Sequence, residues 1–236
     1  MAQFNATQDH YSFKGIAIFA GLEPVALEKI KRGCSWRHYQ PGELIVDYLD
    51  ASDDVFFITS GEVRVTIYSR AGKVVSLGEL GSGEVFGEYA AIDQRPRSAS
   101  VEARTTCVIA SMPAALFRAL LRTTPEVTWA VLTELVRRAR AVTNRVYEFS
   151  TLHVRSRIQA EVLRLASMAP REGKSARIVP PPAHVDIASR VSTHREAVTR
   201  ELSHLSRIGI IERQDDALLV RDIDRLAEMV HEVTGE

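Results

Sequence analysis

Cysteine and long apolar runs are both scarce in this chain. Only Cys34 and Cys107 occur among the 236 residues, and they form no C-x-x-C motif. A disulfide framework or a cysteine-held zinc or iron–sulfur site is therefore not expected, and a reducing cytoplasm is the expected location. No apolar run approaches about 18 residues, and the first residues contain no signal-peptide core, so we expect no membrane span.

Neither charge is in excess, because 30 Lys and Arg residues balance 30 Asp and Glu residues. A nucleic-acid partner would therefore have to meet a local basic patch rather than the chain as a whole. The sequence also lacks a Ser/His/Asp or Cys/His constellation and histidines at metal-ligand spacing. We therefore expect the protein to be neither an enzyme nor a metal carrier.

Short β-type segments dominate the first half of the chain. From Cys34 to Met112, runs such as VFFITS, EVRVTIYS and TCVIASM alternate with PG, SG and GSG turn signals. This spacing predicts an antiparallel roll or barrel of many short strands. A short helix over Glu23 to Arg32 precedes it, with Pro24 near its start and Gly33 just after its end.

A long helix follows Pro125, in a stretch without further glycine or proline. Residues at alternating spacings of four and three form a heptad seam, which indicates a coiled-coil pairing with a second copy of the chain. The alternative is an amphipathic helix that packs on its own roll, with its arginines on a solvated face. The seam consists of Thr128, Leu132, Leu135, Ala139, Val142, Val146 and Phe149.

The last third of the chain has the pattern of a winged helix-turn-helix. A helix over Arg155 to Ala169 and a turn-rich loop are followed by helices at 183–191 and 194–208, then by the strand–turn–strand IIERQDDALLV and a helix from about Asp222. Two helices joined by a very short turn and followed by a hairpin define this motif. The fold class is therefore α+β, with domains at 1–123 (arm and β-roll), 124–152 (dimerisation helix) and 153–236 (DNA binding).

The second helix of such a motif enters the major groove of DNA with its first turns. Arg195 and Arg200 can each offer a planar fork to guanine, and Glu196 can accept from cytosine. Alternatively, Thr193 and Glu196 form a capping box and have no role beyond their own helix. Over residues 151–236 thirteen basic residues face thirteen acidic ones, so the domain is not basic as a whole. The predicted DNA-binding set is Ser192, Thr193, His194, Arg195, Glu196, Thr199 and Arg200.

The order of β-roll, long helix and winged helix resembles the Crp/Fnr family of bacterial transcription regulators, from about Gly15 to the end of the chain. The string REAVTR that begins at Arg195 is similar to the family's R-E-T-V-x-R, whose bearers read TGTGA-type half-sites in a palindrome. The resemblance implies a homodimer that presents two such helices about 34 Å apart. It also makes the loop Pro170 to Ser175 a candidate contact for RNA polymerase.

The stretch FGEYAAIDQRPRSASVEA, Phe86 to Ala103, resembles the phosphate-binding cassette of cyclic-nucleotide-binding domains. The resemblance implies that Glu88 binds the ribose 2′-hydroxyl and that Arg97 binds the cyclic phosphate, with Ser98 and nearby backbone amides around it. An arginine fork is the natural partner of a phosphate. The predicted ligand set in this stretch is Gly87, Glu88, Tyr89, Ala90, Arg97, Ser98 and Ala99.

The same resemblance places the nucleotide base against the long helix. Thr143 supplies one hydroxyl there, Val142 lacks the hydroxyl of the best-known pattern, and Asn144 is a possible substitute. The expected allosteric ligand is cAMP, and Ser98 keeps cGMP open as a second choice.

Two alternatives remain at this stage. Glu88 and Arg97 can instead form an ion pair in a roll that has lost its ligand, which leaves a regulator with a different effector. The chain can also be a nucleotide-binding regulatory subunit that contacts a protein partner, although the helix-turn-helix argues against this interpretation.

Overall fold

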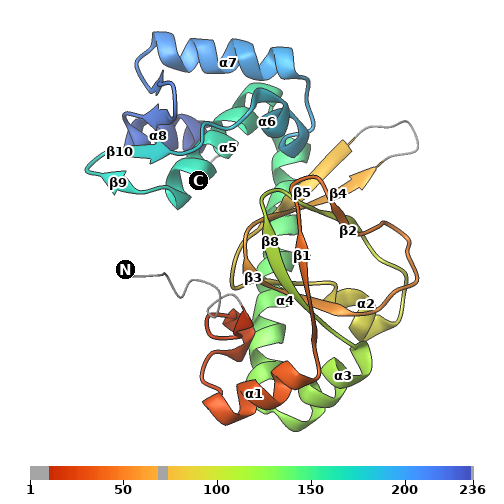
Figure 1. The fold of residues 1–236 in the computed structure, drawn as a ribbon. Coiled ribbons are helices and arrows are strands. Elements are labelled where there is room, and N and C mark those ends of the chain that lie inside the picture. Colours follow the sequence, from red (N-terminus) through yellow and green to blue (C-terminus); the bar gives the residue numbers. More distant parts are fainter. Residues whose placement is uncertain (1–10, 69–73, 235–236) are drawn as a thin grey trace, which may run out of the picture. The chain divides into compact units, whose positions relative to one another are not determined.

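The computed structural model describes residues 11–68 and 74–234, and it divides the chain into two compact units, Met1–Arg138 and Ala139–Glu236. The division falls inside the long helix α4 (Pro125–Thr151), which contributes to both units (Figure 1). Each unit is described by itself below. No helix in the described residues is long and apolar enough to cross a membrane.

The first unit is built on two antiparallel four-stranded sheets, in the orders β1-β8-β3-β6 and β2-β7-β4-β5. The strands are β1 (Ser35–Tyr39), β2 (Leu44–Val46), β3 (Val55–Ser60), β4 (Val63–Tyr68), β5 (Val74–Leu80), β6 (Val85–Phe86), β7 (Ser100–Ala103) and β8 (Cys107–Met112). The helices are η2 (Ala17–Phe19), α1 (Pro24–Arg32), α2 (Glu88–Asp93), α3 (Ala114–Thr123) and the first half of α4.

Strand β3 shows why the roll forms from these residues. Phe56 and Ile58 point into a core shared with strands of the other sheet, whereas Val55 and Phe57 point to a second core beneath the helices. Alternate side chains of a strand point to opposite faces, so a strand covered on both faces has to be apolar throughout. All four residues are less than 9% exposed, and this burial fixes the register of the strand.

The helices of the first unit close the second core. Val127 and Val131 from α4 and Phe117 from α3 are almost fully buried there. The seam residue Leu135 also packs against this core, so the predicted seam is shared between two faces of the helix. The part of α4 within the first unit therefore packs on its own roll, as the alternative interpretation required.

The second unit contains the remaining helices and a four-stranded antiparallel sheet in the order β11-β12-β10-β9. Its elements after α4 are α5 (Val154–Met168), β9 (Arg171–Glu172), β10 (Ser175–Ile178), α6 (His184–Arg190), α7 (Arg195–Arg207), β11 (Ile211–Arg213), β12 (Leu218–Val220) and α8 (Ile223–Thr234).

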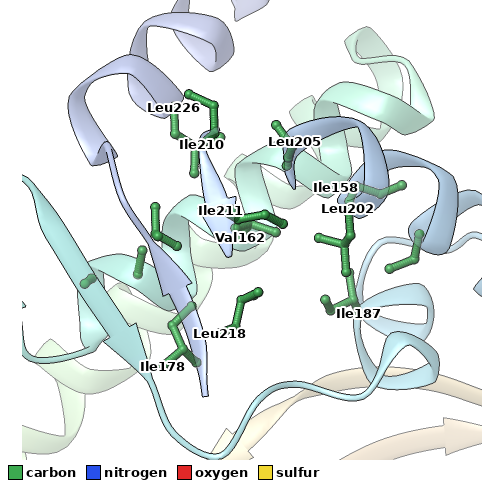
Figure 2. Packing of buried hydrophobic residues seen from close by; sticks show 14 of the residues in the cluster. Ile158, Val162, Ile178, Ile187, Leu202, Leu205, Ile210, Ile211, Leu218 and Leu226 are labelled. Atoms are coloured by element: carbon green, nitrogen blue, oxygen red, sulfur yellow. The ribbon is translucent and has the colours of Figure 1, made fainter. Parts of the chain in front are cut away.

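One apolar cluster holds the helices and sheet of this unit together (Figure 2). Ile158 and Val162 from α5, Ile187 from α6 and Leu205 from α7 are each no more than 1% exposed and lie in the same cluster. The sheet contributes Ile211 and Leu218, among others. This shared core fixes α6 and α7 as a pair, which is what a helix-turn-helix requires.

The prediction of a turn-rich loop after α5 is wrong in part. Strands β9 and β10 lie within it, and β10 pairs with β12 through Ala176, Arg177 and Ile178. Strand β10 has only four residues, and the turn-forming Gly173 before it and the prolines after it made the whole segment resemble a loop. Ala176 and Ile178 are buried while Arg177 is exposed, so the alternation of a half-buried strand was present but too short to stand out.

Candidate ligand and DNA sites

Arg97 is the central feature of the first unit. Its side chain is 2% exposed, and its Nε donates to Ser52 Oγ at 3.0 Å while Nη1 donates to the Gly87 carbonyl oxygen at 3.0 Å. The remaining nitrogen, Nη2, is buried and has no hydrogen-bond partner among the described residues. An unpartnered nitrogen on a buried cation is costly, so the site fits an anion that accepts from it.

The electrostatics around Arg97 favour the same conclusion. Burial lowers the pKa of its guanidinium, and nearby carboxylates, led by Asp54, oppose that shift. No carboxylate of the described residues lies within salt-bridge distance of Arg97, and its guanidinium stacks over the Phe56 ring at 5.4 Å. The charge is therefore held in place by neutral contacts and left available to an incoming anion.

Gly87 is the residue that lets this arrangement form. Its φ of +82° lies in the left-handed region, which side chains other than glycine seldom adopt. A Cβ at this position would lie 2.7 Å from Arg97 Nη1 and 2.8 Å from the Asp54 carbonyl oxygen. The close approach of backbone and guanidinium is therefore possible only for glycine.

Glu88 forms its salt bridge with Arg138 and not with Arg97, so the alternative interpretation of an ion pair between Glu88 and Arg97 is not what the structure shows. Its carboxylate is buried and accepts from Arg138 Nη1 of α4 at 2.7 Å. Burial raises the pKa of Glu88, and the positive charges of Arg138 and Arg97 oppose that shift. Arg138 also binds Glu134 Oε1 at 2.7 Å and the Val85 carbonyl oxygen at 2.7 Å, so it is held from three sides.

The other predicted cassette residues divide into buried and exposed positions. Ala90 and Ala99 are buried, at 3% and 8% exposure, and small side chains are what this packing requires. Tyr89 is 44% exposed and Ser98 is also exposed, so both present side chains to the surface beside the cassette. The structure therefore brings Gly87, Glu88 and Arg97 together at one buried site.

Thr143 and Asn144 lie on α4 within the second unit, and both are exposed. The Thr143 hydroxyl donates to the Ala139 carbonyl oxygen at 3.0 Å, which is the usual bond of a threonine inside a helix. Their predicted role toward the nucleotide base stays a prediction.

The recognition helix α7 begins at Arg195. Its N-cap residue is His194, so Thr193 is not the N-cap. Among the described residues, the side chains of Thr193 and Glu196 make no hydrogen bond, so the capping box of the alternative interpretation is not formed. Glu196 and Arg200 are exposed on α7 together with Arg195. Ser192, at φ +50°, makes the tight turn before the helix.

Ion pairing explains how a domain with balanced charge keeps a basic surface. Five of its arginines form salt bridges with carboxylates: Arg155, Arg164, Arg177, Arg190 and Arg221. Seven others form none with any described carboxylate. Four of the seven lie on or next to α7, and we call them the free arginines: Arg195, Arg200, Arg207 and Arg213. The remaining three are Arg157, Arg171 and Arg225. Three of the four free arginines lie on α7 and the fourth on the adjacent strand β11, so more than half of the unpaired arginines of this domain cluster around the recognition helix.

The outer face of α4 carries exposed apolar residues along its length. Leu132, Val136, Val142 and Val146 are 49–62% exposed, and Trp129 is 73% exposed. Large apolar side chains in such a row are atypical of a free surface and typical of an interface. The row shares Leu132, Val142 and Val146 with the predicted seam, and Trp129 and Val136 lie beside it.

Arg138 is the site residue that the sequence did not reveal. It lies between two other arginines of α4, Arg137 and Arg140, so the sequence alone gives no reason to distinguish it from solvent-exposed arginines of the helix. The only local signal is the spacing of four from Glu134, which is common on helix surfaces. Its contact with Glu88, 50 positions away, depends on the tertiary fold.

Comparison with known proteins agrees with both units. Residues 36–124 match the cyclic nucleotide-binding domain family, and residues 156–229 match the Crp-like helix-turn-helix domain family. A CRP-like cAMP-activated global transcriptional regulator from Mycobacterium tuberculosis is 26% identical over 211 residues, which cover 89% of this chain and 94% of that protein. The cyclic AMP receptor protein of Thermus thermophilus is 28% identical over 216 residues, covering 92% and 97%.

Solved structures share the fold. The c-di-GMP responsive global regulator CLP of Xanthomonas campestris has a TM-score of 0.73 at 20% identity, covering 84% of this chain and 99% of that one. The catabolite activator protein of Thermus thermophilus has a TM-score of 0.53 at 26% identity, covering 92% and 99%. The chain belongs to the Crp/Fnr family: it is a DNA-binding regulator with a cyclic nucleotide-binding domain, and its relatives are transcriptional regulators rather than enzymes.

Proposed function

We propose that this protein is a homodimeric transcription regulator of the cytoplasm whose binding to a palindromic operator is controlled by a cyclic nucleotide. The observation that carries the proposal is the buried Arg97 with its unpartnered Nη2, next to the buried carboxylate of Glu88. A cyclic nucleotide offers one anionic phosphate to the first and one ribose hydroxyl to the second. Arg138 opposes the rise in the pKa of Glu88 that burial causes, and its hydrogen bond orients the Glu88 carboxylate.

We propose cAMP as the effector and cGMP as the second candidate. Several of the curated relatives are named for activation by cAMP. CLP, whose solved structure shares the fold, is named for its response to c-di-GMP. Thr143 and Asn144 are the proposed contacts of the base, and Ser98 is the residue that favours an additional guanine contact. All three ligands therefore belong in the test.

We propose an operator built from TGTGA-type half-sites. The free arginines Arg195 and Arg200 can each donate two parallel hydrogen bonds to guanine, and Glu196, which makes no cap, can accept from cytosine. Ser192, Thr193, His194 and Thr199 would contact the backbone around them. The segment Pro170 to Ser175 is the proposed contact for RNA polymerase.

Isothermal titration with cAMP, cGMP and c-di-GMP tests the ligand site. We expect Arg97→Gln to weaken nucleotide binding by at least about 30-fold, because a buried charged partner is lost. Arg95→Gln is the matched control, since Arg95 is exposed two positions away in the same loop. Equal binding by wild type and Arg97→Gln would contradict the site.

Fluorescence anisotropy with a palindromic TGTGA duplex tests the gating. We expect tight binding only with the nucleotide present, and none for Arg97→Gln at the same nucleotide concentration. A ligand shifts such an equilibrium only through its differential affinity for the DNA-binding state. Nucleotide binding without any DNA binding would instead favour the regulatory-subunit alternative, and tight DNA binding by Arg97→Gln without ligand would contradict gating.

A further inference from the structure

A recessed surface of the second unit lies beside the recognition helix. Its main hollow has a volume of about 490 Å³ and a floor of buried apolar side chains, Leu202, Ile211 and Leu218. A second hollow of about 330 Å³ extends to Arg195. Both hollows are lined by Pro181, Pro182, His184 and Arg213, so they form one continuous groove between α7, β11 and the segment before α6.

The ionisable groups that line this groove are basic. They are Arg195, Arg207, Arg213 and His184, and neither hollow is lined by an aspartate or glutamate among the described residues. The three arginines are free arginines, without a carboxylate partner in the described part of the chain. A groove with this lining fits an anion.

His184 connects the three elements that border the groove. The Thr199 hydroxyl of α7 donates to the Arg195 carbonyl oxygen at 3.0 Å, so its oxygen must accept the bond from His184 Nδ1 at 2.8 Å. The proton of the neutral imidazole is therefore on Nδ1, and Nε2 is an acceptor. Arg213 Nη1 of β11 lies 3.5 Å from that Nε2.

The surroundings of His184 keep its ring neutral in the free protein. Desolvation lowers the pKa of His184, and the charges of Arg213 and Arg195 lower it further. These two arginines come from the two elements packed against it, β11 and α7, while the third border, Pro181 and Pro182, adds no charge. A negative charge placed between His184 and Arg213 would reverse this effect and favour the imidazolium.

We propose that a backbone phosphate of the operator occupies this groove between Arg213 and His184, and that each such phosphate brings one proton from solvent onto His184 Nε2. The proton turns Nε2 from an acceptor into a donor toward the phosphate oxygen, while the bond from Nδ1 to Thr199 is unchanged. This inference rests on the proposed function. DNA is the expected source of the phosphate because Arg195, the proposed base reader, lines the same groove.

The sign of the resulting pH dependence follows from linkage. The pKa of His184 is below its ordinary value in the free protein and is raised when the phosphate binds, so the complex holds more protons. Operator affinity therefore rises as the pH falls through the interval between the two pKa values, whose lower limit lies below the ordinary histidine value of about 6.5. The limit is about tenfold per pH unit for each protomer.

Anisotropy titrations of the full chain with a labelled palindromic duplex and saturating nucleotide, from pH 6.0 to 7.5 at constant ionic strength, test the proposal. We expect the wild type to gain about tenfold or more in affinity over this range. His184→Gln should keep its affinity at pH 7.5 within about threefold and lose the gain at low pH. His153→Gln is the control, because this histidine is exposed in the same unit, has no proposed contact with DNA and should leave the gain intact.

Arg213→Gln supplies a second variant on the other side of the phosphate. We expect weaker binding at every pH and a salt dependence whose log–log slope is smaller by about one per protomer, the signature of one lost phosphate contact. A pH gain that survives in His184→Gln, or that disappears in His153→Gln, overturns the inference while leaving the proposed function intact. Absence of DNA binding by the wild type with every nucleotide overturns both.

Discussion

At the scale of single residues, the contact between Glu88 and Arg138 is the most informative feature. Arg138→Gln leaves the buried carboxylate of Glu88 without its cation, and we expect the free energy of unfolding to fall by about 3 kcal/mol. This value is at the lower end for a broken buried ion pair, because the Arg138 side chain is 19% exposed. Urea denaturation measures the loss. Arg137→Gln is the matched control: Arg137 is 60% exposed and pairs on the surface, so its loss should cost less than about 1 kcal/mol.

The deficit of Arg138→Gln should depend on pH. The pKa of Glu88 is raised in the folded protein, so this group stabilises the fold less as the pH rises through that value. Without Arg138 the pKa of Glu88 rises further, and protonation removes the unpaired charge. We therefore expect a smaller deficit at pH 5 than at pH 7, and an equal deficit at both would contradict the assignment.

At the scale of elements, the exposed apolar row on α4 predicts the oligomeric state. Val142→Glu places a charge on a residue that is 62% exposed in the single chain, so the fold of the chain should survive. In a dimer paired through this row the charge would be buried without a partner, and we expect the dissociation constant to rise by about 100-fold or more. Light scattering should then report the 26.2 kDa chain at concentrations where the wild type is a dimer.

Ala141→Glu serves as the control for that variant. It adds the same charge at the neighbouring position, which is also exposed but lies on a different face of the helix. A dimer that dissociates equally in both variants would contradict an interface along the row that contains Leu132, Val136, Val142 and Val146.

The elements also show what the sequence could and could not predict. Helices α1, α4, α5 and α7 were predicted within one or two residues, because proline, glycine and apolar periodicity are local signals. Helix α3 and strand β10 were missed, the latter because its pairing with β12 is set by residues 40 to 44 positions away. Leu135 was assigned to the seam because the sequence does not show which apolar residues of α4 are covered by the β-roll of the same chain.

The same distinction applies to the candidate site. The sequence predicted Gly87, Glu88 and Arg97 because one short segment contains all three at a typical spacing. Arg138 and His184 were not predicted, because Glu88 and Arg213 reach them only through the tertiary fold. Sequence counts also gave a neutral second unit and could not show which arginines are already paired.

At the scale of the whole molecule, two compact units predict two thermal transitions with different responses to ligand. Nucleotide at about 100 times its dissociation constant stabilises the unit that binds it by about 2.7 kcal/mol, or roughly 10 °C for a unit of this size. Calorimetry should show this shift mainly in the transition of the first unit, which contains Arg97 and Glu88. Arg97→Gln should show no shift, and Arg95→Gln should behave like the wild type; a shift that persists in Arg97→Gln would refute the assignment.

The pairing of arginines with carboxylates in the second unit bears on how such a regulator searches a genome. Arbitrary DNA is bound through phosphates alone, and the strength of that binding grows with the number of counterions that free cations displace. Here five arginines are already neutralised by their own chain, so fewer cations attract duplex of any sequence, and more than half of the unpaired arginines lie around α7. Fewer molecules are then held at the vast excess of wrong sites, and a smaller cellular supply suffices to fill each operator.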